Sequence, residues 1–126
     1  MDRKVAVTAC IFGVLAVISG AFGAHGLKAV LDETQLEQWK TAVSYQFYHT
    51  FALLFLSLFH VKSKLLNTAY WGFTLGIILF SGSIYLLSTR NITGFDWVFL
   101  GPVTPVGGLF FIIGWMCLLT AAIKSK

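Results

Sequence analysis

The sequence is poor in charge, and its few charged residues lie between long apolar stretches. Of its 126 residues, 11% are charged and 57% are hydrophobic. Soluble domains carry roughly 25% charged residues, and a chain this short has too little interior to hide so much apolar surface from water. These two facts exclude a soluble globular enzyme and a disordered chain. The net charge of +4 comes from scattered lysines and arginines, so we expect no nucleic acid partner.

Carboxylates and cysteines are also scarce. None of the five Asp and Glu residues falls within the apolar stretches, whereas a proton-coupled carrier normally places a carboxylate in the membrane. The two cysteines, Cys10 and Cys117, form no Cys-x-x-Cys motif and indicate no disulfide framework. A glycine-rich phosphate loop and a serine–base–acid set are missing as well. We therefore expect a non-enzymatic protein without a cofactor or a metal site.

The apolar stretches are long enough to cross a membrane. Runs without Asp, Glu, Lys or Arg cover residues 5–27, 41–61, 65–89 and 97–123. About 20 apolar residues span the hydrocarbon core as a helix, and a backbone in lipid must satisfy its own hydrogen bonds. A signal peptide in the first run is disfavoured, because its apolar region is usually only about 7–15 residues long. We predict an all-α polytopic membrane protein, a single four-helix transmembrane bundle over residues 1–126 with helices at about 5–25, 41–61, 66–89 and 98–123.

The lysines and arginines predict the orientation, because cytoplasmic loops carry an excess of both. An N-terminus inside the cell leaves only Lys28, Lys40 and Arg90 outside. The cations on the inner side are then Arg3, Lys4, Lys62, Lys64, Lys124 and Lys126. We therefore expect both termini to be cytoplasmic.

The connector between the first two runs has a pattern of its own. Residues 26–40 interleave apolar and charged side chains, which predicts an amphipathic extracytoplasmic segment. Asp32 is suited to cap a helix that continues into the second run.

The polar residues of the second run share one helical face. At 100° per residue, Gln46, His49, Thr50 and Ser57 fall together, and the phenylalanines of the run fall opposite. Polar side chains in a membrane face the bundle interior or a wet cavity. We expect these four residues to point inward.

Matching faces occur on the neighbouring runs. Thr74, Ser81, Tyr85 and Ser88 lie on one side of the third helix, where their hydroxyls can bond to the second helix. On the first helix a stripe of small residues lets backbones approach closely, which predicts a packing face. The stripe consists of Ala9, Gly13, Ala16, Gly20 and Gly23.

The start of the fourth run is rich in helix-disturbing residues. Pro105 removes a hydrogen-bond donor, and Gly107 and Gly108 make the backbone more flexible. We expect a kinked or partly unwound segment at membrane depth, which lipid permits only where protein or a cavity covers the freed carbonyls. The segment, with Thr104, is therefore a candidate site wall, and a plain proline kink is the alternative.

Two histidines can be placed near the outer leaflet. His25 ends the first helix, and His49 lies on the polar face of the second. Such a pair would suit a bis-histidine haem, although a lone intramembrane histidine more often bonds to a neighbouring Tyr or carbonyl. The candidate ligand-binding residues are His25, Tyr45, Gln46, His49, Thr50, Ser81, Tyr85, Thr104, Pro105, Gly107 and Gly108.

Four ordered motifs carry a family resemblance. They are Gly-Ala-Phe-Gly-Ala-His-Gly-Leu at 20–27, Tyr-Gln-Phe-Tyr-His at 45–49, Phe-Ser-Gly-Ser-Ile-Tyr at 80–85, and Thr-Pro-Val-Gly-Gly at 104–108 followed by Gly114-Trp115. In this order and spacing the chain resembles the YgdD/YwdK family of small bacterial inner-membrane proteins. The resemblance covers nearly the whole chain and implies a four-helix protein of the cytoplasmic membrane. It implies no reaction and no established site.

The sequence leaves several roles open. The leading hypothesis is a non-enzymatic protein with an outer-leaflet site between helices for a lipid, a quinone or another apolar small molecule. The alternatives are a small oligomeric channel or carrier for a neutral or anionic solute, a haem-binding protein, and an assembly partner of a larger membrane complex. The expected partners are the lipid bilayer and either further copies of the chain or another membrane protein.

Overall fold

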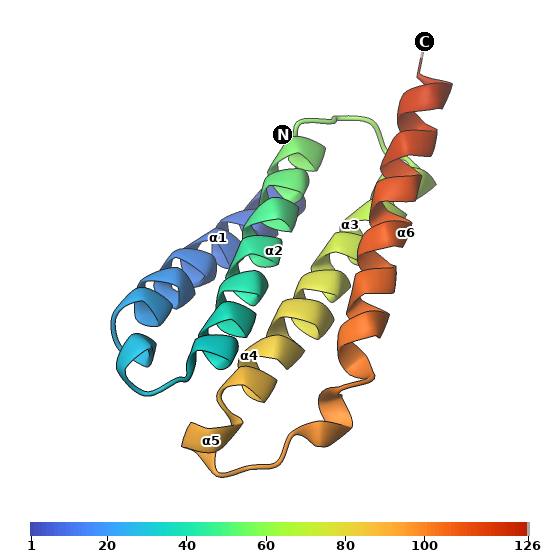
Figure 1. Cartoon of the computed structure of the whole chain (residues 1–126). Helices are drawn as coiled ribbons and strands as arrows, with labels where there is room; N and C mark the ends of the chain where they lie inside the picture. The colour runs from blue at the N-terminus through green and yellow to red at the C-terminus, as the bar shows by residue number, and fades with distance from the viewer. Residues whose placement is uncertain (126) are drawn as a thin grey trace.

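The computed structural model describes residues 1–125, and this part is helical without any strand. In Figure 1, α1 and α6 lie on opposite flanks of α2 and α3–α4, and both termini lie at the same end. Lys126, counted above among the inner cations, lies outside the described residues. The elements are α1 (Arg3–Ala24), the 3₁₀ turn η1 (Leu27–Ala29), α2 (Glu33–Ser57), α3 (Lys64–Gly76), the π-helical turn η2 (Ile77–Ser81), α4 (Gly82–Ser88), α5 (Arg90–Thr93), the 3₁₀ turn η3 (Val98–Leu100) and α6 (Val103–Lys124).

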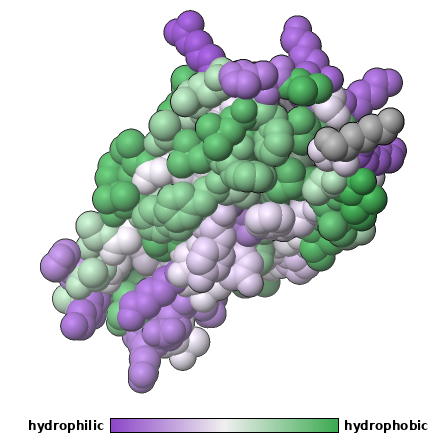
Figure 2. All heavy atoms as spheres, turned by 90° about the horizontal axis from the view of Figure 1, so that it is seen from above, coloured by the Kyte–Doolittle hydropathy of each residue, from purple (hydrophilic) through white to green (hydrophobic). Residues whose placement is uncertain are grey.

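Three helical segments are long and apolar enough to cross a membrane: Arg3–Ala29, Lys64–Ser88 and Val98–Lys124. On the face seen in Figure 2, hydrophobic residues form a broad area and hydrophilic residues project at its margins. The structure thus confirms an all-helical chain with membrane-spanning character. α2 is as long as the three segments but less apolar, because polar residues occupy both its first turns and its buried face.

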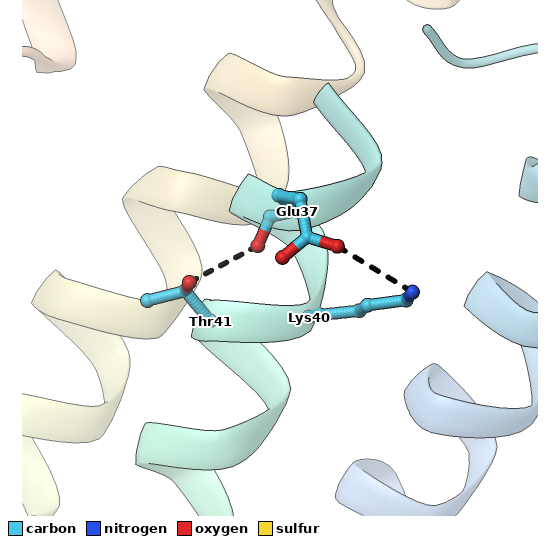
Figure 3. A network of polar contacts seen from close by, with 3 residues as sticks. All are labelled: Glu37, Lys40 and Thr41. Atoms are coloured by element: carbon cyan, nitrogen blue, oxygen red, sulfur yellow. Dashed lines mark hydrogen bonds and ion pairs between the residues drawn. The ribbon is translucent and has the colours of Figure 1, made fainter. Parts of the chain in front are cut away.

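The first turns of α2 carry polar and charged side chains that are exposed to solvent. The Lys40 ammonium lies 3.6 Å from the Glu37 carboxylate, and both side chains are mostly exposed. The Thr41 hydroxyl donates to the Glu37 carbonyl oxygen at 3.0 Å (Figure 3). This charged beginning and the polar residues in the middle of the helix together keep α2 out of the three apolar segments.

A capping box fixes the start of α2 at Glu33, which confirms the cap predicted at Asp32. The helix thus begins before residue 41, the predicted start of the span itself. The Gln35 backbone N–H donates to Asp32 Oδ1 at 2.8 Å, and the Asp32 N–H donates to Gln35 Oε1 at 3.2 Å. This reciprocal pairing satisfies two donors that a helix start leaves free. The connector is therefore shorter than expected, and its Leu27 and Leu31 are buried against Trp39.

The third span is one rod with a wider turn inside it. At η2 the Gly82 N–H donates to the Ile77 carbonyl, five residues back, as in a π-helix. The rod therefore carries one more residue than a regular helix of its length would hold. Before η2 in the chain, α3 packs mainly on α6, and after it α4 packs mainly on α2.

The expected break within residues 101–108 is wrong in position. α6 is a continuous helix from Val103, and the irregular turn lies before it, at Gly101 and Pro102. Pro105 therefore falls in the first turn, where backbone N–H groups have no intrahelical acceptor in any helix. The missing donor costs nothing there, and the helix stays intact.

α6 approaches α3 and η2 through glycines. A Cβ atom on Gly72 would lie 2.9 Å from the Phe110 carbonyl oxygen, and one on Gly114 would lie 2.7 Å from the Phe73 ring. A Cβ on Gly107 would overlap the backbone nitrogen of Phe80. Small residues allow this close backbone approach.

α1 packs on α2 through its small-residue stripe. Ala9 and Ala16 are fully buried. A Cβ atom on Gly13 would lie 3.6 Å from Thr50 Cγ2, and one on Gly20 would lie 3.5 Å from Val43 Cγ1. The remaining stripe residue, Gly23, lies against the indole of Trp39.

Hydrogen bonds between side chains and backbone tie this packing together. Gln46 Nε2 donates to the Phe12 carbonyl at 2.9 Å, and Gln46 Oε1 accepts from the Tyr85 hydroxyl at 2.7 Å. Trp39 Nε1 donates to the Ser19 carbonyl at 2.8 Å. Gln46 thus joins α1, α2 and α4 in one network.

Candidate functional site

A groove of about 780 Å³ opens between α2, η2 and the first half of α6. Its walls are largely aromatic. It is lined by Tyr45, Tyr48, His49, Phe80, Pro105, Gly108, Leu109, Phe111, Ile112 and Trp115.

His49 lies at the inner wall of the groove and is 5% exposed. Its ring stacks on Phe111, with centroids 3.5 Å apart and planes 7° from parallel. Trp115 Nε1 donates to His49 Nε2 at 3.1 Å. His49 Nδ1 lies 2.7 Å from the Tyr45 carbonyl oxygen.

These contacts assign a role to the histidine. An Nε2 that accepts from Trp115 leaves Nδ1 to carry the proton and donate to the carbonyl, so one neutral tautomer satisfies both nitrogens. The imidazole holds the Trp115 indole in place and has no free lone pair to offer a ligand. His49 is therefore a positioning residue in this structure.

The polar atoms open to a guest are phenol hydroxyls. Tyr45 is 38% exposed and Tyr48 is 58% exposed. Within residues 1–125 neither hydroxyl makes a hydrogen bond. The Tyr45 ring also lies 4.6 Å from the Phe80 ring, centroid to centroid. The groove thus combines an aromatic floor with two hydrogen-bonding groups.

The structure brings only part of the predicted site together. Tyr45, His49, Pro105 and Gly108 line the groove, where their binding role stays a prediction. His25 is exposed at the end of α1. The remaining predicted residues contact neighbouring helices away from the groove lining: Gln46, Thr50, Ser81, Tyr85, Thr104 and Gly107. Gln46 and Tyr85 belong to the α1–α2–α4 network.

Two more predicted residues, Ser81 and Thr104, make specific contacts away from the groove. The Ser81 hydroxyl donates to the Ala42 carbonyl at 2.8 Å. The Thr104 hydroxyl lies 2.6 Å from that of Ser83. The hydroxyls of the third span therefore bond to both α2 and α6.

Thr50 faces α1 beside Gly13. Its buried Oγ1 has no hydrogen-bond partner among the described residues, and the same holds for Thr74 Oγ1.

The pairing of His25 with His49, considered above for a haem, is not present in the structure, and His49 instead bonds to a carbonyl and to Trp115. His25 is exposed at the C-terminal cap of α1. Trp39 donates to the Ser19 carbonyl near this end of α1. His49 lies ten residues after Trp39 in α2, so the two positions are about 15 Å apart along the helix axis at 1.5 Å per residue. Residues 1–125 also contain no group of three or more His, Cys, Asp and Glu that could hold a metal ion.

Sequence reasoning missed most of the α6 wall. Leu109, Ile112 and Trp115 follow Pro105 and Gly108 at helical spacing along one face. Because α6 is apolar on all sides, a helical wheel like that used for α2 does not single out this stripe. Which helix faces it depends on packing that the wheel does not contain.

The fold and groove together define a class: a helical membrane protein with an aromatic groove between helices. A family model described as "Protein of unknown function (DUF423)" matches residues 19–108. The chain is 40% identical over 121 residues to the UPF0382 membrane protein YwdK of Bacillus subtilis, covering 94% of each chain. It is 36% identical over 128 residues to the UPF0382 inner membrane protein YgdD of Escherichia coli, covering 99% of this chain and 93% of the relative.

A third relative, a UPF0382 membrane protein of Haemophilus influenzae, is 35% identical and covers the full length of this chain and 98% of its own. The chain therefore belongs to the UPF0382 membrane protein family, as its four motifs predicted. No solved structure matches it.

Proposed function

We propose that the protein crosses the bacterial inner membrane four times, with α2 as the fourth span and both termini in the cytoplasm. The positive-inside distribution of lysines and arginines supports this orientation. The common end of the two termini supports an even number of crossings (Figure 1). α2 has 25 residues, and its polar middle faces protein. The name of YgdD supports the inner membrane as the location.

Labelling of single cysteines tests this topology. In a background with Cys10→Ser and Cys117→Ser, Asn91→Cys is expected to react with a membrane-impermeant maleimide in intact spheroplasts. Ser63→Cys is expected to react only after the membrane is opened. Labelling of Ser63→Cys in intact spheroplasts would contradict the proposed orientation.

We further propose that the groove binds an apolar small molecule, a quinone or a lipid, without catalysing a reaction. The observation that carries this proposal is the aromatic lining of the groove, held open beside the His49–Trp115 hydrogen bond. Its volume lies within the roughly 300–1,000 Å³ typical of small-molecule sites. Flat aromatic walls suit a conjugated ring, and the hydroxyls of Tyr45 and Tyr48 suit a carbonyl or ester oxygen.

The channel and haem alternatives have less support. The small residues of α1 pack on α2, and the hydroxyls of the third span bond to α2 and α6, so neither surface is left to line a pore within one chain. The haem hypothesis depended on the pairing of His25 with His49, which the structure does not contain.

A groove-filling variant tests the binding proposal. A Cβ on Gly108 would meet only the Phe80 ring, at an ordinary 3.8 Å, so Gly108→Leu fills the groove without forcing the helices apart. Gly82→Leu is the matched control, because a Cβ there meets nothing within 4 Å.

The measurement is native mass spectrometry of gently extracted protein, with extraction and identification of bound quinones and lipids. Gly108→Leu should lose a stoichiometric adduct that the wild type and Gly82→Leu retain. Circular dichroism must show equal helicity in the three proteins. Equal adduct occupancy in all three would refute the proposal.

A further inference from the structure

A second cavity lies at the end of the molecule that holds the two termini. It has a volume of about 610 Å³ and lies between the start of α1, the end of α2 and the start of α3. Four cationic groups line it: the Met1 amino group, Lys4, Lys62 and Lys64. One carboxylate, that of Asp2, lines it as well.

The cavity carries an excess of positive charge within the described chain, because four cations face one carboxylate. That carboxylate, Asp2, also caps α1, since its Oδ1 accepts from the Val5 N–H at 3.3 Å. The ion pair found within residues 1–125 joins Lys40 and Glu37, far from this cavity. The Lys4 ammonium instead lies 4.7 Å above the centre of the Tyr70 ring. A hollow lined by charges of one sign raises the local concentration of ions of the opposite sign, in this case anions.

The cavity wall is held in a fixed shape. The Asp2 N–H donates to the Ser57 carbonyl at 2.7 Å, which ties the start of α1 to the end of α2. The Thr8 and Tyr70 hydroxyls lie 2.9 Å apart and join α1 to α3. The cations thus converge from three elements onto one hollow.

The floor of the cavity is apolar. Val5 is 7% exposed and Leu56 is 3% exposed, and both line the cavity beneath the lysines. Exposed Phe59 and Val61 line it as well and continue this apolar surface outward. A cationic rim above an apolar floor matches a ligand with an anionic head and a hydrocarbon tail.

We propose that this cavity binds the phosphate group of an anionic phospholipid. Basic pockets between membrane helices are suited to anionic headgroups. The site is distinct from the aromatic groove and does not depend on the ligand proposed there. A soluble phosphate would offer the same head without a tail, so the experiment must separate the two sources.

The test uses the full chain in neutral detergent and two double variants. Lys62→Gln with Lys64→Gln removes two cations that line the cavity. Lys28→Gln with Lys124→Gln removes the same charge elsewhere. All four side chains are exposed, so both variants are expected to fold. Native mass spectrometry measures binding of added phosphatidylglycerol, phosphatidylcholine and inorganic phosphate.

We expect phosphatidylglycerol to bind in preference to phosphatidylcholine, and the cavity variant to weaken it by about tenfold or more, since each lysine near a lipid surface contributes substantially. The control variant should bind as the wild type does. If inorganic phosphate bound as well as phosphatidylglycerol, and the two lipids bound equally, the cavity would be a site for soluble phosphate. That result would overturn the lipid as its ligand. Equal lipid binding by the two variants would overturn the proposal.

Discussion

The α1–α2 interface and the α3–α6 interface hold helices together by different means. α1 meets α2 through small residues and through directional bonds from Trp39 and Gln46 to its backbone carbonyls. α6 meets α3 and η2 through glycines and aromatic rings, with backbones so close that a Cβ has no room at Gly107. One interface is set by hydrogen bonds and the other by steric fit.

The difference shows how a short membrane-embedded chain can adopt one helix arrangement without a core formed by the hydrophobic effect. Lipid tails are as apolar as leucine side chains, so burying leucine between helices in a membrane gains little. Hydrogen bonds and close van der Waals packing remain as the sources of specificity. The protein relies mainly on the first between α1 and α2 and on the second between α6 and α3.

The largest effect is expected at the steric interface. Gly107→Ala should lower the free energy of unfolding by about 1–3 kcal/mol or more, because its Cβ meets backbone that cannot move aside. Gly82→Ala is the matched control and should be neutral or stabilising, since glycine is a poor helix former. Unfolding by SDS in dodecyl maltoside micelles measures both. A neutral Gly107→Ala would show that α6 does not approach η2 this closely.

A smaller effect is expected at the hydrogen-bonded interface. Gln46→Met keeps the length of the side chain but loses bonds to Phe12 and Tyr85, so it should cost about 1–2 kcal/mol of unfolding free energy. Gln38→Met is the control, because Gln38 is exposed on the same helix. The SDS titration would contradict the network if the two variants were equally stable.

Tyr85→Phe sharpens the same comparison with a single atom. It removes one of the two bonds and should cost about 0.6–1.7 kcal/mol. Combined with Gln46→Met, the loss should be less than the sum of the two single losses, because the variants share one bond. Strict additivity in the double-mutant cycle would mean that the Tyr85–Gln46 bond contributes nothing.

The smallest effect is expected at Pro105. Because this residue lies in the first turn of α6, Pro105→Ala should change the unfolding free energy by no more than about 0.5 kcal/mol. Its circular dichroism should show unchanged helicity. A clear gain in helical signal would indicate that the proline does interrupt the helix.

Some of this arrangement follows from the sequence because it depends on local periodicity. The buried face of α2, with Gln46, His49 and Thr50, is set by the 3.6-residue repeat and the cost of polar groups in lipid. The Asp32 cap likewise marks a helix start by its chemistry alone. The family resemblance rests on motifs that are also local.

The remaining features depend on which helix meets which. Trp115 and His49 are 66 residues apart, and the sequence of neither helix indicates that the two side chains are in contact. Pro105 was misjudged because the effect of a proline depends on its distance from the helix start, which the structure places at Val103. Ser81 and Tyr85 do bond to α2, as the polar face of the third helix predicted, but which acceptor each hydroxyl meets depends on this packing.

The π-helical turn has a consequence for how this chain tolerates insertions and deletions. Because η2 takes up one extra residue within the same length of rod, removing one residue from Ile77–Ser81 would leave a regular helix with α4 still in place against α2. Tyr85 would still face Gln46 while α3 kept its contacts with α6. A one-residue gap at this position in a relative is therefore compatible with the same bundle, whereas a gap elsewhere in the span would turn the residues beyond it by about 100°.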